Sequence, residues 1–383
     1  MSGPSQRQGV MVLNAVPGLG PVRISRLLDA FAGSAAAVLE APASALRQVE
    51  GIGPETSAAI VSWRSHFDLE REEEQLARIG ADYILKGEAG YPERLAELPG
   101  APLGLYIRGC VTSCPSVAIV GTRRATLYGR RVARTFATEL ARAGICVVSG
   151  LARGIDGEAH EGALATGRTL AFLGCGLDVD YPPEHAELAQ RISQSGAVIS
   201  EYYLGRKPDA QTFPQRNRLI SGSADAILVV ESDVKGGSMI TASFAAEQGR
   251  MVFAVPGRID QPSSRGCHAL IRDGATLAAC AQDIIDEIRH QFPRRAIKTP
   301  IGAARPEQTE LGICAAPSLS DDERKVLGAL EDGAVLHPDA ICRICVMAQP
   351  AVMSALMMLE LKRLVARRPD ASYEAQGRAT RQI

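Results

Sequence analysis

Hydrophobic and polar positions follow different patterns along the 383 residues of the chain. In the first part, apolar residues recur at helical spacing; in the middle, short apolar runs alternate with amphipathic stretches. Further on, prolines accumulate and the periodicity is lost before helical spacing returns. The pattern predicts an N-terminal helical domain (1–78), an α/β core (79–292), a linker (293–318) and a small C-terminal domain (319–383).

Two turns of the form glycine–hydrophobic–glycine precede predicted helices in the N-terminal domain. They are Gly18-Leu19-Gly20 and Gly51-Ile52-Gly53, each followed by a proline and an apolar helical pattern. Both resemble the turn of a helix–hairpin–helix (SAM-like) domain, in which glycines allow close backbone approach and free N–H groups can hold a phosphate. A purely structural helical domain with tight turns would show the same pattern. Few basic residues flank the turns, so DNA contact by this domain stays open.

The middle region predicts strands that alternate with helices. The expected strands are Val117–Val120, Cys146–Ser149, Thr169–Leu173, Ala197–Ser200, Ala226–Val230 and Met251–Val255, with Tyr83–Lys86 and Leu105–Arg108 as candidate strands before them. The expected helices are 129–143, 156–166, 184–195, 214–223 and 238–249. Apolar strands alternating with helices are typical of an α/β fold with a doubly wound parallel sheet.

The C-terminal domain shows three predicted helices followed by a β-ribbon, the pattern of a winged helix. The helices begin at the capping box Ser320–Glu323, near Pro338 and near Gln349. The third helix is mostly Ala, Met and Leu until Lys362 and Arg363. A helix that reads a DNA groove needs polar and basic side chains early. This composition favours a protein-contact role over sequence readout.

Candidate chemistry gathers where the predicted strands end. In a doubly wound sheet, ligands bind beyond the carboxyl ends of the strands. Nearly every predicted strand is followed by a glycine, a basic residue or both, and positive charge beside free backbone N–H groups suits phosphates. A single arginine in such a loop is usually a solvated charge, but six loops share this edge. The candidate binding residues are Gly121, Thr122, Arg123, Arg124, Gly150, Arg153, Gly154, Lys207, Phe213, Arg216, Asn217, Arg218, Lys235, Gly237 and Ser238.

Composition limits how an anionic partner could be held. The formal net charge is −1, so no global basic field attracts nucleic acid, and any such partner must meet locally clustered charge. Arginine far outnumbers lysine, which suits forked phosphate contacts, although a GC-rich genome produces the same bias. Four aromatic residues fall near the strand-end loops, where each stacked base contributes about 1–3 kcal/mol. They are Tyr128, Tyr202, Tyr203 and Phe213, and packing is the alternative role, above all for Phe213.

Several catalytic and cofactor motifs are missing from the sequence. No GxGxxG opens the sheet, no Gly-Lys pair forms a Walker A loop, and no GxSxG elbow occurs. Asp156 and His160 stand one turn apart, as a metal pair would. Without a third ligand, a capping aspartate and a structural histidine are favoured. We therefore expect a binding protein with no catalytic set, no cofactor and no metal.

The cysteines and the chain start bear on location. Nine cysteines are scattered, and Cys342 with Cys345 lacks the second pair of a zinc site. The first residues have no apolar core of a signal peptide, and no run reaches the about 18 apolar residues of a membrane span. We expect reduced thiols, a cytoplasmic protein and no membrane partner.

Several segments together resemble the DNA-processing protein A (DprA, also Smf) family. They run in family order over about residues 85–280 and include Val117–Arg123, Val148–Asp156, Phe213–Ile220, Gly237–Ala242 and Val255–Gly257. The resemblance implies a Rossmann-like core that binds single-stranded DNA, dimerises and helps load the RecA recombinase during natural transformation. It carries DNA binding over to Arg123 and, more loosely, to Arg153, Lys207, Arg216, Arg218, Lys235 and the Gly237-Ser238 helix start. Arg124 matches a position that is commonly basic in the family.

Three hypotheses remain at this point. The first is a single-stranded DNA binder without enzymatic activity. The resemblance implies a role in natural transformation, although family members also occur in bacteria not known to take up DNA. The second is a Rossmann-like nucleotide-processing hydrolase in which Glu201 or Glu231 acts as a base. The third is a dimeric scaffold whose DNA affinity is incidental, and a steep salt dependence would separate the first from it.

Overall fold

The computed structural model describes residues 3–291, 319–330, 334–362, 364–368 and 370–375. The chain forms two compact units, Met1–Pro300 and Ile301–Ile383. The domain boundary predicted at residue 78 falls inside the first unit, so the helical region and the α/β core pack as one body. The linker predicted at 293–318 and the side chain of Arg363 lie outside the described residues.

The N-terminal region of the first unit is helical. Its elements are α1 (Gln6–Ala15), α2 (Pro21–Ala30), α3 (Ala35–Glu40), α4 (Ala43–Leu46), α5 (Pro54–Val61), η1 (Trp63–Ser65) and α6 (Leu69–Arg78). Both α2 and α5 start at a proline directly after a glycine–hydrophobic–glycine turn, as the sequence predicts. In these turns Gly18 and Gly51 have φ values of 74° and 87°, a backbone conformation that glycine adopts readily.

A nine-stranded sheet forms the centre of the first unit, in the order β1-β2-β6-β5-β4-β3-β7-β8-β9. The strands are β1 (Ala81–Leu85), β2 (Gly104–Gly109), β3 (Ser116–Val120), β4 (Cys146–Ser149), β5 (Thr169–Leu173), β6 (Ala197–Ser200), β7 (Ala226–Val229), β8 (Met251–Ala254) and β9 (Thr276–Leu277). From β6 to β9 all neighbours are parallel, whereas β1 and β2 pair antiparallel with each other and β2 pairs antiparallel with β6. The doubly wound sheet is confirmed, and the two candidate strands form β1 and β2.

Helices cover both faces of the sheet because successive strand residues point to opposite sides. In β3, Val117 and Ile119 join the core beneath α8 (Leu127–Arg142), α9 (Ile155–Leu164) and α14 (Ala281–Gln291). Ala118 and Val120 face the other way, toward helices that follow later in the chain. These are α11 (Thr212–Gly222), α12 (Gly237–Glu247) and α13 (Arg265–Arg272), with the short α7 (Glu93–Ala96).

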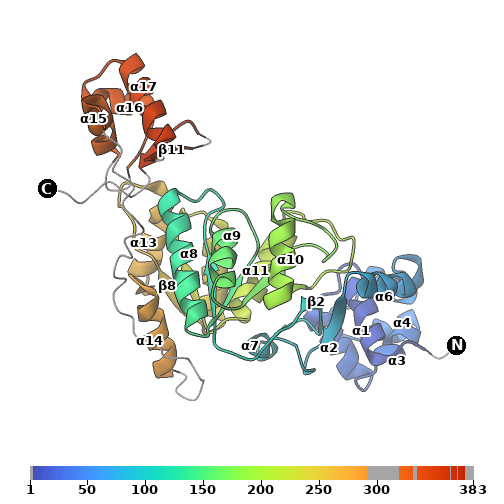
Figure 1. Ribbon diagram of the computed structural model, residues 1–383. Helices are drawn as coiled ribbons and strands as arrows, with labels where there is room; N and C mark the ends of the chain where they lie inside the picture. The colour runs from blue at the N-terminus through green and yellow to red at the C-terminus, as the bar shows by residue number, and fades with distance from the viewer. Residues whose placement is uncertain (1–2, 292–318, 331–333, 363, 369, 376–383) are drawn as a thin grey trace. The chain divides into compact units, whose positions relative to one another are not determined.

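The N-terminal helices continue the layer formed by α8, α9 and α10 (Ala186–Ser195), as Figure 1 shows. One hydrophobic core joins α10 and β6 to α1, α2 and α3, with Tyr106 of β2 among its buried side chains. Two 3₁₀ turns, η2 (Pro183–His185) and η3 (Pro262–Ser264), complete this unit. The helical region is therefore attached to the sheet through a shared core, beside β6.

The order of the strands creates a switch point beside β3. The chain moves outward from β3 through β4 and β5 to β6, then returns to place β7 on the other side of β3. The loops that leave β3 and β7 therefore diverge to opposite faces of the sheet. In open α/β sheets the crevice at such a point is the usual place for a ligand.

The second unit is a winged helix, as predicted. It contains α15 (Asp321–Ala329), β10 (Val335–Leu336), α16 (Pro338–Cys345), α17 (Gln349–Leu361), β11 (Val365–Arg367) and β12 (Tyr373–Ala375), with the sheet order β10-β12-β11. Ser320 and Glu323 form the expected capping box. Among the described residues, no single helix is long and apolar enough to cross a bilayer; α16 and α17 pass that test only as a pair bent by 110°.

Candidate functional site

A cavity of about 450 Å³ opens at the switch point between the loops that follow β3 and β7. Two helices on the same face of the sheet, α11 and α12, supply its other walls. Its lining includes Gly121, Thr122, Arg123, Phe213, Arg216, Asn217, Gly237 and Ser238. Eight of the residues predicted from the sequence therefore surround one cavity, although they come from three separate segments of the chain.

Two glycines fix the path of the loop after β3. A Cβ on Gly121 would lie 2.5 Å from the side chain of Ile155 and 2.9 Å from the carbonyl oxygen of Glu231. A Cβ on Gly154 would lie 2.4 Å from the carbonyl oxygen of Thr122, and Gly154 has a φ of 78°. The Thr122 amide donates to the Glu231 carbonyl at 2.7 Å. The absence of side chains lets the loops after β3, β4 and β7 touch.

Arg123 is exposed at the mouth of the cavity. Its guanidinium carbon lies 4.9 Å from the centroid of the half-buried Phe213 ring, a cation–π contact. Phe213 also packs 5.4 Å from Tyr181, centroid to centroid. The ring thus packs against its surroundings and orients the arginine at the same time. Arg124, next in the chain, is exposed too.

The opposite wall is the beginning of α12. The helix starts at Gly237, and no side chain among the described residues caps its N-terminus. Ser238 donates from its hydroxyl to Ser232 at 2.7 Å, and the Asn217 amide donates to the Gly237 carbonyl at 3.4 Å. The exposed Lys235 stands just before the helix. Uncapped N–H groups, the positive helix end and a lysine together favour an anion here.

Arg216 lies in the interior wall of the cavity, with only 3% of its surface exposed. Its Nη1 donates to the carbonyl oxygens of Gly150 and Phe172, the latter at 2.6 Å. A Cβ on Gly150 would lie 2.1 Å from that nitrogen, so the glycine makes room for the arginine. Gly150 and Arg216, which the sequence placed among the phosphate contacts, are both buried. Their polar groups bind each other instead of solvent.

Asp156 is the buried countercharge of Arg216. Burial raises the pKa of the Asp156 carboxyl, and the positive charge of Arg216 acts against this rise. The carboxylate accepts from the amides of Gly150 and Ala152 at 3.2 and 3.4 Å. The N-cap of α9 is Gly154, so Asp156 is not the capping residue that the sequence suggested. It holds the loop after β4 in shape from within the first turn of the helix.

His160 is structural, as expected from the sequence. Its Nε2 accepts from the Leu151 amide at 3.3 Å, and its Nδ1 lies 2.7 Å from the Thr169 hydroxyl. Burial lowers the pKa of the imidazole to about 3, so the ring is neutral near pH 7. Among the described residues, no group of three or more His, Cys, Asp and Glu is arranged to hold a metal ion.

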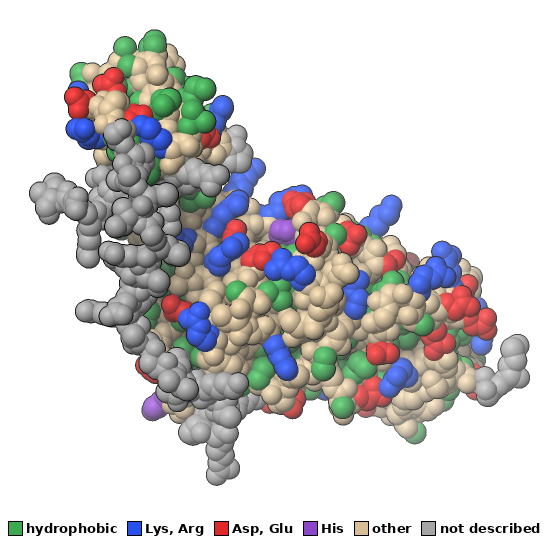
Figure 2. Space-filling model, viewed as in Figure 1, with side chains coloured by type: hydrophobic (Ala, Val, Ile, Leu, Met, Phe, Trp, Pro, Cys, Tyr) green, Lys and Arg blue, Asp and Glu red, His purple; other side chains and the backbone are tan. Residues whose placement is uncertain are grey.

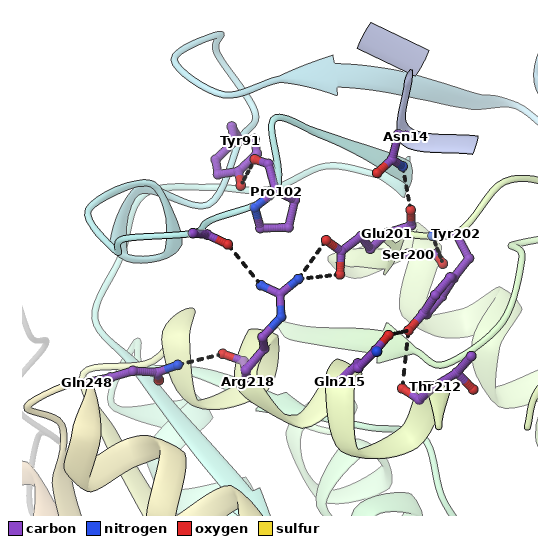
Figure 3. Close-up of polar contacts among 11 residues, drawn as sticks. Asn14, Tyr91, Pro102, Ser200, Glu201, Tyr202, Thr212, Gln215, Arg218 and Gln248 are labelled. Carbon is purple, nitrogen blue, oxygen red and sulfur yellow. Dashed lines mark hydrogen bonds and ion pairs between the residues drawn. The ribbon is translucent and has the colours of Figure 1, made fainter. Parts of the chain in front are cut away.

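Two further predicted cations are neutralised by carboxylates from other segments. Arg153 pairs with Glu184, with an Nη2–Oε2 distance of 3.0 Å. Arg218 donates from Nη2 to both oxygens of Glu201 at 2.6 and 2.5 Å, and from Nη1 to the Gly100 carbonyl at 3.3 Å (Figure 3). No local sequence pattern indicates these pairings, because the partners lie 17 and 31 positions away.

The visible face of the first unit shows the same balance of charge. In Figure 2 the blue side chains of Lys and Arg are interspersed with red carboxylates over α8, α9 and α10. Ion pairs account for part of this mixture, such as Arg134 with Glu158 at 2.7 Å and Arg191 with Glu161 at 2.8 Å. The cations that lie outside these pairs and near the cavity are Arg123, Arg124 and Lys235, while Lys207 is exposed in the loop after β6.

The two carboxylates that the hydrolase hypothesis needed as bases are both engaged. Glu231 accepts from the amide and the hydroxyl of Thr126, at 3.0 and 2.6 Å, and thereby fixes the beginning of α8. Glu201 is bound to Arg218, and burial raises the pKa of its carboxyl while that arginine lowers it. Both residues are buried, and their hydrogen bonds stabilise the loops at the strand ends.

The fold and its cavity define a class: a Rossmann-like α/β protein with an anion-favouring site at its switch point and a winged-helix unit. The model of the family DNA recombination-mediator protein A matches residues 82–289, and that of the DprA winged helix domain matches residues 314–371. The chain belongs to the DNA-processing protein A (DprA/Smf) family.

Named relatives and solved structures agree with this membership. Protein Smf from Synechocystis is 33% identical over 94% of this chain and 96% of its own length, and DNA processing protein DprA from Streptococcus pneumoniae is 40% identical over 51% and 71%. The X-ray structure of the S. pneumoniae protein matches with a TM-score of 0.64 at 31% identity, covering 75% of this chain and 99% of that one. A structure on the single-stranded DNA binding mode of the Helicobacter pylori protein matches with a TM-score of 0.51 at 31% identity, over 56% and 98%.

Proposed function

We propose that this protein binds single-stranded DNA at the carboxyl-end edge of its sheet. The observation that carries the proposal is the switch-point cavity, where Arg123, the aromatic ring of Phe213 and the uncapped start of α12 face one space. Single-strand sites combine positive charge along the backbone with rings for base stacking. The H. pylori relative, whose structure concerns single-stranded DNA binding, supports the choice of ligand.

Each group has a distinct role in this proposal. Arg123, Arg124 and Lys235 neutralise phosphates from outside the cavity, and the N–H groups at the start of α12 hydrogen-bond a phosphate within it. Phe213 holds Arg123 over one face of its ring and contributes an aromatic surface against which a base lies. Arg216 acts as a positioning residue: buried and bonded to two carbonyls, it shapes the wall without touching DNA.

The wider role follows from the family. We propose that the protein acts in the cytoplasm as a homodimer, protects incoming single-stranded DNA and loads the RecA recombinase onto it during natural transformation. No step in this role needs bond making or breaking by the protein. Lys207, Arg153 and Arg218 remain predicted DNA contacts, the last two only if the strand displaces their carboxylate partners.

The test is fluorescence anisotropy with labelled oligonucleotides at several salt concentrations. Arg123→Ala should weaken single-strand binding about tenfold, as expected for loss of a charge-assisted contact. Arg142→Ala is the matched control, because this exposed arginine ends α8 and therefore lies at the opposite edge of the sheet. Equal affinity of the folded Arg123 variant and the control would overturn the assignment, and so would a lack of preference for single over double strands.

A further inference from the structure

A second groove, about 680 Å³ in volume, lies beside the switch-point cavity in the same compact unit. One wall is the first glycine–hydrophobic–glycine turn with the start of α2, and the other is the loop that follows β6. The sequence left the role of this turn open, and the proposed function does not use the groove. The residues that line it are Asn14–Arg23, Tyr202, Tyr203, Arg206 and Gln215.

The lining combines rings, cations and exposed backbone. Tyr202 and Tyr203 are half-buried, and the Tyr203 and Phe67 ring centroids lie 6.2 Å apart with the rings nearly perpendicular, which limits the motion of Tyr203. Arg23 is exposed and donates from Nη1 to the Gly18 carbonyl at 2.7 Å, a bond that uses one of the five donors of a guanidinium. Arg206 adds a second cation, paired with Asp209.

Two long-range hydrogen bonds set the width of the groove. The Asn14 side chain donates to the Glu201 carbonyl at 2.7 Å, which ties the end of α1 to the end of β6 (Figure 3). The buried Glu72 carboxylate of α6 accepts from the Leu204 amide at 2.8 Å. The N-terminal helices therefore hold the loop after β6 at two positions, Glu201 and Leu204, and the groove is preformed.

The groove and the switch-point cavity share the first turn of α11. Phe213 and Pro214 line the cavity, whereas Gln215 lines the groove. Tyr202 spans the boundary: its hydroxyl donates to Gln215 at 3.1 Å, as Figure 3 shows. The loop after β6 makes the same passage, since Tyr202 and Arg206 line the groove and Ala210 lines the cavity.

We propose that this groove is a second binding site for the same single strand, which leaves the switch-point cavity across the first turn of α11 and enters between the N-terminal turn and the Tyr202-Tyr203 loop. Bases lie against the tyrosine rings, and Arg23 contacts a phosphate. A lining that combines aromatic rings with cations is the chemistry of single-strand grooves. This inference rests on the proposed function and gives the N-terminal helical region a direct part in it.

The test compares two oligonucleotide lengths, about 5 and about 15 nucleotides, which span the usual range of single-strand sites. Arg23→Ala should weaken binding of the longer one about three- to tenfold and lower the slope of log affinity against log salt by about 0.7, the value for one phosphate on a single strand. The shorter one should lose less than about twofold, as expected for a strand that the cavity alone accommodates.

Arg26→Ala is the control on the same helix. Arg26 is also exposed, but it pairs with Glu50 at 3.4 Å and does not line the groove. The fluorescence of Trp63, the single tryptophan and a buried one, verifies that both variants keep the helical region folded. Photo-crosslinking of the unmodified protein to a long strand containing 5-iodouracil provides a readout without substitution, and should label the peptide that carries Tyr202 and Tyr203.

The outcomes separate the inference from the function beneath it. In one outcome, Arg123→Ala weakens binding of both oligonucleotides, Arg23→Ala binds the long strand as well as Arg26→Ala does, and crosslinks form only at Phe213 or Tyr181. The groove inference is then wrong, and single-strand binding at the sheet edge stands. If the unmodified protein binds neither length, the proposed function fails and the inference fails with it. Selective loss on the long strand with a lower salt slope supports both.

Discussion

Replacing Arg216 with methionine tests how the cavity wall is built. The guanidinium is buried, bonds two carbonyl oxygens and balances Asp156. Methionine keeps the bulk but leaves the carboxylate buried without its countercharge. The two charge-assisted bonds to the carbonyl oxygens contribute about 1.5–3 kcal/mol each, and the positive charge also offsets the cost of the buried Asp156 carboxylate. We therefore expect the free energy of unfolding of the first unit to fall by about 3–5 kcal/mol.

The assay is urea unfolding of the full chain, followed by far-UV circular dichroism and by Trp63 fluorescence, which reports on the first unit. Asp156→Asn and the double variant complete a double-mutant cycle. Since the double variant leaves no unpaired charge, its loss should be smaller than the sum of the single losses by at least about 1 kcal/mol. Additive losses, or a loss below about 1 kcal/mol for Arg216→Met, would refute this account of the wall.

The pH dependence gives a second check with a fixed sign. Burial already holds the folded-state pKa of Asp156 above its ordinary 3.8, and removing Arg216 should raise it further. The folded variant then keeps a proton that the unfolded chain has lost, so its stability falls as pH rises from about 4 through the folded pKa. The difference in the free energy of unfolding between Arg216→Met and the parent should therefore become smaller at acidic pH. A difference that is constant with pH would contradict the electrostatic explanation.

Three further predictions concern other elements. Gly154 and Gly205 both have positive φ, so an alanine at either position introduces about 1–3 kcal/mol of backbone strain. Only a Cβ on Gly154 also meets a backbone atom, the Thr122 carbonyl oxygen, at 2.4 Å. Gly154→Ala should therefore lower the free energy of unfolding, measured in urea, more than Gly205→Ala. The His160 imidazole resonances should stay constant in NMR from pH 8 to about 4. The free energy of unfolding should fall as pH drops below 6.5, because only the unfolded chain binds this proton. An NMR titration of His160 with a midpoint near 6.5 would be inconsistent with the buried ring. Ser320→Ala should lower the free energy of unfolding of the second unit by about 1 kcal/mol, seen as a lower thermal transition temperature. The unfolding transition of the first unit, followed by tryptophan fluorescence, should not change.

The strands of the central sheet were predictable from the sequence, because the apolar patterns that encode them lie within short stretches of the chain. Apolar runs gave the strands β3 to β8 to within one residue at each end, and the capping box gave the start of α15. Glycines after strands marked the loops around the cavity, since Gly121 and Gly154 stand where a Cβ would collide with a neighbouring loop. The short β10 went unpredicted because two residues carry no period.

The charge state of the edge was not predictable in the same way. Arg123, Arg153, Arg216 and Arg218 look alike in sequence, each being a basic residue near a strand end. In the structure the first is exposed, the second and fourth are paired with Glu184 and Glu201, and the third is buried. Whether an arginine is available to a phosphate depends on which carboxylate the fold brings to it. That partner comes from a distant segment, so residue type and spacing do not reveal it.

The placement of β7 beside β3 also determines when the binding edge exists during synthesis. Every segment that lines the cavity between Val120 and Asp156 leaves the ribosome well before α12, which begins at Gly237. At about 5–20 residues per second, bacterial translation needs several seconds or more to cover that interval. Until then the nascent chain presents half of a cavity with an unpaired side of β3. A message truncated before α12 would therefore yield a protein that has the loop after β3 and the α11 wall of the cavity but lacks the wall formed by α12.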